Sequence, residues 1–134
     1  MANTTFSGPV RSENGFDMIT KNTTTGAVTA NASYDKGIRG GVQTLSGAGA
    51  VDLVNLITEI TTTGADALTL ADGTTSGQVK IINMIVDGGD GTLIPVTFAN
   101  GTTITFDAVA ESATLVWNST IGWVATSVQG ATIA

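Results

Sequence analysis

The stretch QVKIINMIVDGGDGTLIPVTFANGTTITFD, residues 78–107, indicates the fold class of this chain of 134 residues. Runs of Val, Ile and Thr alternate in it with Asp-Gly and Asn-Gly pairs, which are the usual signals of tight turns between strands. β-Branched residues dominate the whole chain, with 24 Thr, 12 Val and 11 Ile. Because branched side chains lose rotamer freedom in helices and pack well on pleated sheets, this composition predicts an all-β protein.

Seven strands follow from this rhythm, separated by the turn sequences ADGTTSG, DGGDG, ANG and NSTIG. They cover residues 51–62, 67–70, 78–86, 93–98, 102–107, 112–117 and 122–128. The first of them is ambiguous, since Leu53, Leu56 and Ile60 also fit the spacing of a helix. We interpret it as a strand because the Thr run 61–63 favours one. Short strands at this spacing predict an antiparallel β-sandwich or jelly roll.

The strand predicted at 78–86 is apolar on both faces. Its two sets of alternate positions are Val79, Ile81 and Ile85 against Ile82, Met84 and Val86. A strand with two apolar faces is covered by protein on both sides, which is typical of a central strand or of a strand at a subunit interface. All seven aromatic residues lie at or before Tyr34 or at or after Phe98, so the middle of the chain builds its core from small side chains. Such a core contributes little burial, and we therefore expect the protein to form an oligomer.

Residues 1–42 differ from the rest in charge and composition. They carry four basic residues against three acidic ones, whereas residues 43–134 carry Lys80 alone against eight acids. The first segment is rich in Gly, Asn, Ser and Thr, which predicts an extended N-terminal arm ahead of a β-sandwich body over 43–134. A hairpin of 16–20 against 26–30 is expected within it. An arm of this kind buries little surface, so it should order only against a partner; the alternative is a disordered leader.

The chain has no Cys and no His. This excludes disulfides, thiolate nucleophiles and iron–sulfur sites, and it removes the usual general base and the most common zinc ligand. The sequence contains neither a phosphate-binding loop nor a nucleophile elbow, and the acidic body would repel a nucleic-acid backbone. Its longest apolar run is much shorter than a membrane-spanning helix, and its start lacks the features of a secretory signal. We therefore expect no enzyme activity, cofactor or metal, and no nucleic-acid or membrane partner.

Two acidic clusters are candidates for chemistry. Asp87 and Asp90 in the DGGDG turn are the residue type that binds calcium, but the alternating ligands of an EF-hand loop are missing and turn chemistry explains the pattern better. Asp107 and Glu111 are the residue types of a glycosidase acid pair. Their spacing alone supplies no sugar cleft, so we favour solvated turn carboxylates.

Trp117 and Trp123 flank the NSTIG turn. Indole rings in such a position stack on sugars in some proteins. Packing in the core or at an interface is the more common role of two tryptophans on a hairpin, and it is the interpretation that we favour.

The arm sequence TTFSGPVRSENGF, residues 4–16, and two body sequences between Thr61 and Trp123 resemble small virion proteins of tailed bacteriophages, in particular podoviruses of marine bacteria and cyanobacteria. The body sequences are TTTGADALTLADGTTSGQ and DGGDGTLIPVTFANGTTITFDAVAESATLVWNSTIGW. The resemblance covers most of the chain. It implies a capsid decoration (cement) or head-fibre protein, with a β body assembled as a homotrimer and an extended N-terminal arm lying on the major capsid protein. It also implies a place on the outer surface of the capsid, after synthesis in the host cytoplasm.

The resemblance also implies roles for particular residues. The capsid-binding residues would be Phe6, Pro9, Val10, Arg11, Phe16, Ile19 and Arg39. The apolar side chains would act as anchors, the arginines would pair with carboxylates, and the proline would hold the arm extended. The body core or the seam between subunits would contain Val79, Ile81, Ile85, Trp117 and Trp123.

Two alternative functions lead to different expectations. A head- or tail-fibre module that recognises host-surface glycan would expose aromatic residues beside Asp and Asn in a groove, whereas a cement protein would bury its tryptophans. A sugar-cleaving enzyme would act through Asp107 and Glu111.

Overall fold

The computed structural model describes residues 16–34 and 39–134. The chain divides into two compact units, Met1–Gly40 and Gly41–Ala134. This division falls two residues before the boundary that composition placed after residue 42.

The first unit contains a three-stranded antiparallel sheet in the order β1-β2-β3. Its strands are β1 (Phe16–Lys21), β2 (Val28–Tyr34) and β3 (Arg39–Gly40). β1 and β2 form a hairpin in the region where the sequence predicted one, although the second strand starts two residues later than expected. Asn22 shapes the turn, because its Oδ1 atom accepts hydrogen bonds from the backbone N–H groups of Thr24 and Thr25, both at 2.9 Å.

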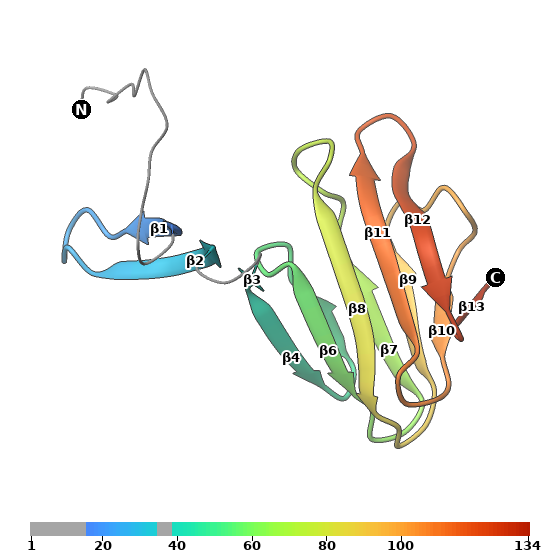
Figure 1. Cartoon of the computed structure of the whole chain (residues 1–134). Coiled ribbons are helices and arrows are strands. Elements are labelled where there is room, and N and C mark those ends of the chain that lie inside the picture. Colours follow the sequence, from blue (N-terminus) through green and yellow to red (C-terminus); the bar gives the residue numbers. More distant parts are fainter. Residues whose placement is uncertain (1–15, 35–38) are drawn as a thin grey trace. The chain divides into compact units, whose positions relative to one another are not determined.

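The second unit is a β-sandwich of two five-stranded sheets, which confirms the all-β sandwich predicted from the sequence (Figure 1). We name each sheet after its central strand. The β8 sheet has the order β12-β11-β8-β6-β4, with β4 (Val42–Ser46), β6 (Ile57–Thr61), β8 (Val79–Val86), β11 (Ser112–Asn118) and β12 (Gly122–Gln129). The β9 sheet has the order β13-β10-β9-β7-β5, with β5 (Gly49–Val51), β7 (Asp66–Leu70), β9 (Gly91–Pro95), β10 (Ile104–Phe106) and β13 (Thr132–Ile133).

From β4 to β9 the chain alternates between the two sheets, so each successive pair of strands stacks on the pair before it. The ladders that result are parallel, namely β4-β6, β6-β8, β5-β7 and β7-β9. The ladders made by the last four strands are antiparallel, namely β8-β11, β11-β12, β9-β10 and β10-β13. Each sheet therefore contains both parallel and antiparallel ladders. The expectation of purely antiparallel pairing is wrong for the ladders among β4 to β9.

The turn sequences explain this difference. The Asp-Gly pairs of ADGTTSG and DGGDG predict hairpins, but ADGTTSG connects β7 to β8 and DGGDG connects β8 to β9, so each segment leads from one sheet to the other. Gly47 makes a similar crossing between β4 and β5, with a φ of 71° that favours glycine. Turn residues of this kind indicate that the chain changes direction, but they do not indicate which strand the next segment pairs with.

The predicted strand 51–62 is wrong in its middle. β5 ends at Val51 and β6 begins at Ile57, and the loop of residues 52–56 crosses between the sheets. β4, most of β5 and β13 were not predicted, because residues 43–50 are rich in Gly and β13 has only two residues.

The predicted strand 93–98 extends three residues too far. β9 ends at Pro95, whose nitrogen has no hydrogen to donate to a ladder. Phe98 then makes a single bridge to Trp123. The remaining predicted strands in this unit agree with the structure to within two residues at each end.

A hydrophobic core fills the space between the two sheets. It consists of Val51, Ile60, Leu68, Leu70, Ile82, Met84, Leu93, Ile104, Phe106, Ala113, Leu115, Trp117 and Trp123. Both sheets contribute through alternate positions, as expected when each has one face toward the core. The described residues include no helix with the length and apolarity needed to cross a membrane.

Candidate functional site

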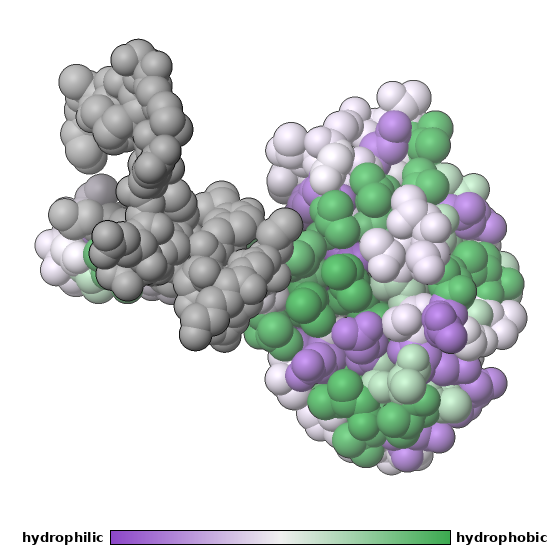
Figure 2. Space-filling view, in the orientation of Figure 1, coloured by the Kyte–Doolittle hydropathy of each residue, from purple (hydrophilic) through white to green (hydrophobic). Residues whose placement is uncertain are grey.

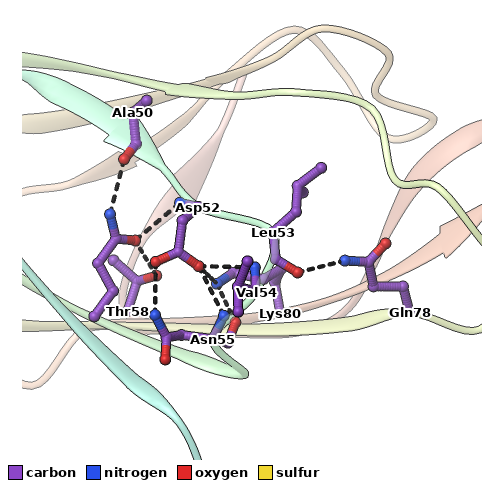
Figure 3. Close-up of polar contacts among 9 residues, drawn as sticks. Ala50, Asp52, Leu53, Val54, Asn55, Thr58, Gln78 and Lys80 are labelled. Carbon is purple, nitrogen blue, oxygen red and sulfur yellow. Dashed lines mark hydrogen bonds and ion pairs between the residues drawn. The ribbon is translucent and has the colours of Figure 1, made fainter. Parts of the chain in front are cut away.

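Lys80 is the one basic residue among residues 41–134, and its side chain is fully buried. The alternation of β8 places it on the same face as Ile82 and Met84, toward the core. Its ammonium group reaches the loop of residues 52–56 (Figure 3). There Nζ donates a hydrogen bond to the backbone oxygen of Asn55 at 2.5 Å and lies 3.8 Å from Oδ1 of Asp52.

Asp52 organises the same loop. Its Oδ1 atom accepts hydrogen bonds from the backbone N–H groups of Val54 and Asn55, at 2.9 and 2.8 Å. Its Oδ2 atom accepts a hydrogen bond from Nδ2 of Asn55 at 2.7 Å. The carboxylate therefore replaces the strand hydrogen bonds that this segment lacks, which explains why the chain turns here.

Two glutamines complete the network around the loop (Figure 3). Gln43 donates from Nε2 to the backbone oxygen of Ala50, and its Oε1 accepts from the N–H of Asp52 and from the hydroxyl of Thr58. Gln78 donates from Nε2 to the backbone oxygen of Leu53 at 2.8 Å. The network ties strands of both sheets to the loop at one end of the sandwich.

Burial and hydrogen bonding shift the pKa values of the ion pair. Burial lowers the pKa of Lys80, and the charge of Asp52 offsets only part of that effect. Burial raises the pKa of Asp52, but the hydrogen bonds from Asn55 and Val54, together with the charge of Lys80, outweigh it, so the pKa of this carboxyl lies below its ordinary value. Because the lysine side chain is enclosed by protein, we interpret the pair as a structural tie between β8 and the loop.

The acidic residues proposed for chemistry have structural partners. Oε2 of Glu111 accepts a hydrogen bond from the backbone N–H of Asp107 at 2.7 Å, which closes the turn before β11. Oδ1 of Asp87 accepts from the N–H of Gly89 at 2.9 Å, as the turn interpretation of DGGDG predicts. Within residues 16–34 and 39–134, no three acidic side chains are grouped as metal ligands.

The two tryptophans lie in the core. Trp117 is 7% exposed and Trp123 is fully buried, with ring centroids 5.4 Å apart and planes tilted by 59°. Nε1 of Trp123 donates a hydrogen bond to the backbone oxygen of Ala71 at 2.9 Å. Core packing accounts for both rings, and neither presents a face for stacking on a sugar.

The outer face of the β8 sheet is apolar over two adjacent rows of residues. The registers of the ladders align Val79, Val116 and Val124 in one row, and Val42, Ile57 and Ile81 with the hydroxyl residues Thr114 and Ser127 in the next. Figure 2 shows apolar residues gathered over this sheet in the orientation of Figure 1. Val42 is 50% exposed, and the other apolar members are partly exposed. We call these six Val and Ile side chains the apolar patch.

A polar row borders the apolar patch. It contains Thr44, Glu59, Asn83, Ser112 and Gln129, one from each strand of the sheet. In Figure 2 a band of hydrophilic residues lies below the apolar area. Ile85, which is 42% exposed, lies on the same face beyond this row. The face thus divides into an apolar part and a polar part with a single charged residue, Glu59.

The outer face of the β9 sheet is different. Its outward residues are mainly small or hydroxylated, namely Ala50, Ala67, Thr69, Thr92, Ile94, Thr105 and Thr132. Threonines and alanines on an exposed sheet face are typical of contact with water, whereas contiguous Val and Ile are typical of contact with protein. The asymmetry between the two faces singles out the β8 sheet as the candidate binding surface.

The predicted site residues fall into three groups. Phe6, Pro9, Val10 and Arg11 lie outside the described residues, and Phe16, Ile19 and Arg39 are described only as members of β1 and β3. Trp117 and Trp123 form part of the core. Val79, Ile81 and Ile85 lie together on the outer face of the β8 sheet, so their role at a seam between subunits stays a prediction.

Sequence reasoning missed the network of Lys80, Asp52 and Gln43. One signal was present, because a lysine at the same alternation as Ile82 and Met84 must face the core.

No family model matches the chain, and no curated protein matches it either.

Proposed function

We propose that this protein is a structural virion component of a tailed bacteriophage, which decorates the outer surface of the capsid and stabilises the shell of the major capsid protein. The apolar patch on the β8 sheet is the observation that carries the proposal. Contiguous, partly exposed Val and Ile side chains on the outer face of a sheet are typical of a protein that packs against other protein.

The side chains that other functions would require have structural roles instead, which supports the same proposal. Glu111 closes a turn, Lys80 is enclosed by protein, and both tryptophans pack in the core. A fibre module that recognises glycan by stacking would need indole rings at the surface, so buried tryptophans favour the decoration role over that alternative.

The mechanism would be thermodynamic. A protein that binds only the expanded shell stabilises that state by mass action, and many symmetric copies multiply a modest contact energy. In this proposal the arm of residues 1–42 supplies the contacts with the shell, through its apolar anchors and its arginines. The body then adds contacts that hold neighbouring parts of the assembly together.

Binding to purified capsids tests the proposal. The full chain is mixed with expanded and unexpanded capsids, and occupancy is measured by sedimentation and by electron cryo-microscopy. We expect saturable binding to the outside of the expanded shell and weaker binding after deletion of residues 2–16. A matched pair of variants, Arg11→Ala and Lys21→Ala, removes one positive charge each, and only the first should reduce occupancy. Failure to bind either form of the capsid would refute the proposal, and undiminished binding of the deletion variant would refute the role of the arm.

A further inference from the structure

The outer face of the β8 sheet combines an apolar patch with low charge in a body that is strongly acidic. Residues 41–134 carry eight carboxylates against Lys80, a net charge of −7. Of these carboxylates only Glu59 lies on the outer face of the β8 sheet. Two acidic bodies repel each other most where their loop carboxylates meet and less through either sheet face, since the outward residues of the β9 sheet carry no charge. Of these two weakly charged faces, only the β8 face has an apolar patch.

We propose that the outer face of the β8 sheet binds the same face of a second copy of this chain. This inference rests on the proposed function only in treating the face as a protein-binding surface. It names the occupant as another copy rather than the capsid shell.

The rows of the face make it self-complementary. In a pair related by a twofold axis parallel to β8, residues at the same level of the sheet meet, and the strands on either side of β8 exchange places. Ile81 then faces the partner's Ile81 and Val79 faces the partner's Val79, whereas Ile57 meets the partner's Thr114. The polar row faces the polar row, so Asn83 meets the partner's Asn83 and Glu59 meets the partner's Ser112. Apolar side chains thus meet along β8, and the two carboxylates stay apart.

The size of the face fits a specific but modest interface. Two rows of side chains cross all five strands and two further rows cross about three, which at about 4.8 Å between strands gives an area of about 500 Å² for each copy. Two copies would bury about 1,000 Å² in total, which is about the minimum for a specific protein–protein interface. We therefore expect association that depends on protein concentration.

Analytical ultracentrifugation of the full chain, without capsids, tests this inference. We expect wild-type protein to associate at micromolar concentration and Ile81→Lys to associate at least about a hundredfold more weakly, because the interface would bury an unpaired ammonium group. Val109→Lys is the matched control, since Val109 is 57% exposed in the loop before β11 and lies outside the face. Thr114→Lys adds the same charge in the row of Ile81 without removing an apolar side chain, so it serves if Ile81→Lys does not fold.

A cross-linking experiment locates the contact. The chain contains no cysteine, so a single introduced thiol reports one position. Asn83→Cys should form a disulfide-linked pair under mild oxidation, whereas Thr92→Cys, at a similarly exposed position on the central strand of the other sheet, should not.

The outcomes separate this inference from the proposed function. Loss of association in the lysine variants of the face, with selective cross-linking at position 83, supports it. Wild-type protein that stays monomeric at micromolar concentration refutes it even if the protein binds capsids, and so does association that Ile81→Lys and Thr114→Lys leave unchanged. Self-association through this face without capsid binding would refute only the proposed virion function.

Discussion

Nζ of Lys80 lies 3.8 Å from Oδ1 of Asp52, with the lysine side chain fully buried and the aspartate side chain 32% exposed. The pair joins the central strand β8 to the loop of residues 52–56, where the chain crosses between the sheets. A buried ion pair adds little stability compared with an apolar pair, but the loss of one partner leaves polar groups without their hydrogen bonds. The first two predictions follow from this asymmetry.

Replacing Lys80 by Met should lower the free energy of unfolding by about 2 kcal/mol. The methionine keeps most of the apolar contacts of the lysine stem, but the backbone oxygen of Asn55 loses its donor. Urea unfolding at neutral pH measures the difference. An unchanged midpoint would mean that the hydrogen bond to Asn55 contributes nothing to stability.

Asp52→Asn should remove part of the loss of stability in acid. The pKa of Asp52 is lower in the folded protein than its ordinary value near 3.8, so the unfolded chain binds more protons as the pH falls. Stability that this carboxylate supplies above that value is lost as the pH falls toward the folded-state pKa. Urea unfolding of both proteins between about pH 5 and pH 2 should show that the variant is less stable at the upper end and that the gap narrows in acid. A constant gap across this range would contradict the assignment.

The sequence predicted the alternation of β8, because one side chain in two must face the opposite sheet. The expectation of a core of small side chains in the middle of the chain is wrong, since Leu68, Leu70 and Leu93 are fully buried there. The sequence could not predict the parallel pairing, since an Asp-Gly turn looks the same in a hairpin and in a crossing between sheets. It also could not predict the loop of residues 52–56. The apolar residues there fit a strand, and the competing hydrogen bonds come from Gln43, Gln78 and Lys80, which lie elsewhere in the chain.

For the candidate surface, alternation alone placed Val79, Ile81 and Ile85 on one face of β8. The rest of the apolar patch comes from four other strands, and only the ladder registers show that these residues are neighbours. For a surface built from several strands, the sequence alone predicts only which residues of each single strand share a face.

Gly73→Ala should destabilise the body by about 1–3 kcal/mol, because a methyl group at this position overpacks the core. A Cβ atom there would overlap Cγ of Trp117 and lie 2.7 Å from Cδ1 of the same ring. Gly64→Ala is the matched control, since a Cβ atom at that position meets nothing within 4 Å. Thermal unfolding of the two variants should show a lower midpoint for the first only. Equal midpoints would mean that the indole ring moves aside at no cost.

Residues 41–134 expressed alone should fold with nearly the same resistance to urea as the full chain. Among the residues whose burial the structure describes, every member of the buried core lies between Val51 and Trp123, so the second unit has a core of its own. Circular dichroism and tryptophan emission follow the transition. An unfolded fragment, or one with a much lower midpoint, would show that the first unit contributes to the stability of the sandwich.

Glu59→Gln should strengthen self-association by about three- to tenfold if two copies meet through the β8 sheet. Glu59 is the only charged residue in the outward rows of this sheet, and association would transfer its carboxylate from water to an interface shared by two acidic bodies. Glutamine keeps the shape and the hydrogen-bonding capacity of the side chain while removing the charge.

Asp90→Asn removes the same charge from an exposed turn outside the face, so it measures the effect of net charge alone. Sedimentation equilibrium at low and high salt should show a larger gain for Glu59→Gln than for Asp90→Asn, and the gain should shrink in high salt because screening weakens the repulsion. Equal gains for the two variants would place the contact between copies away from Glu59.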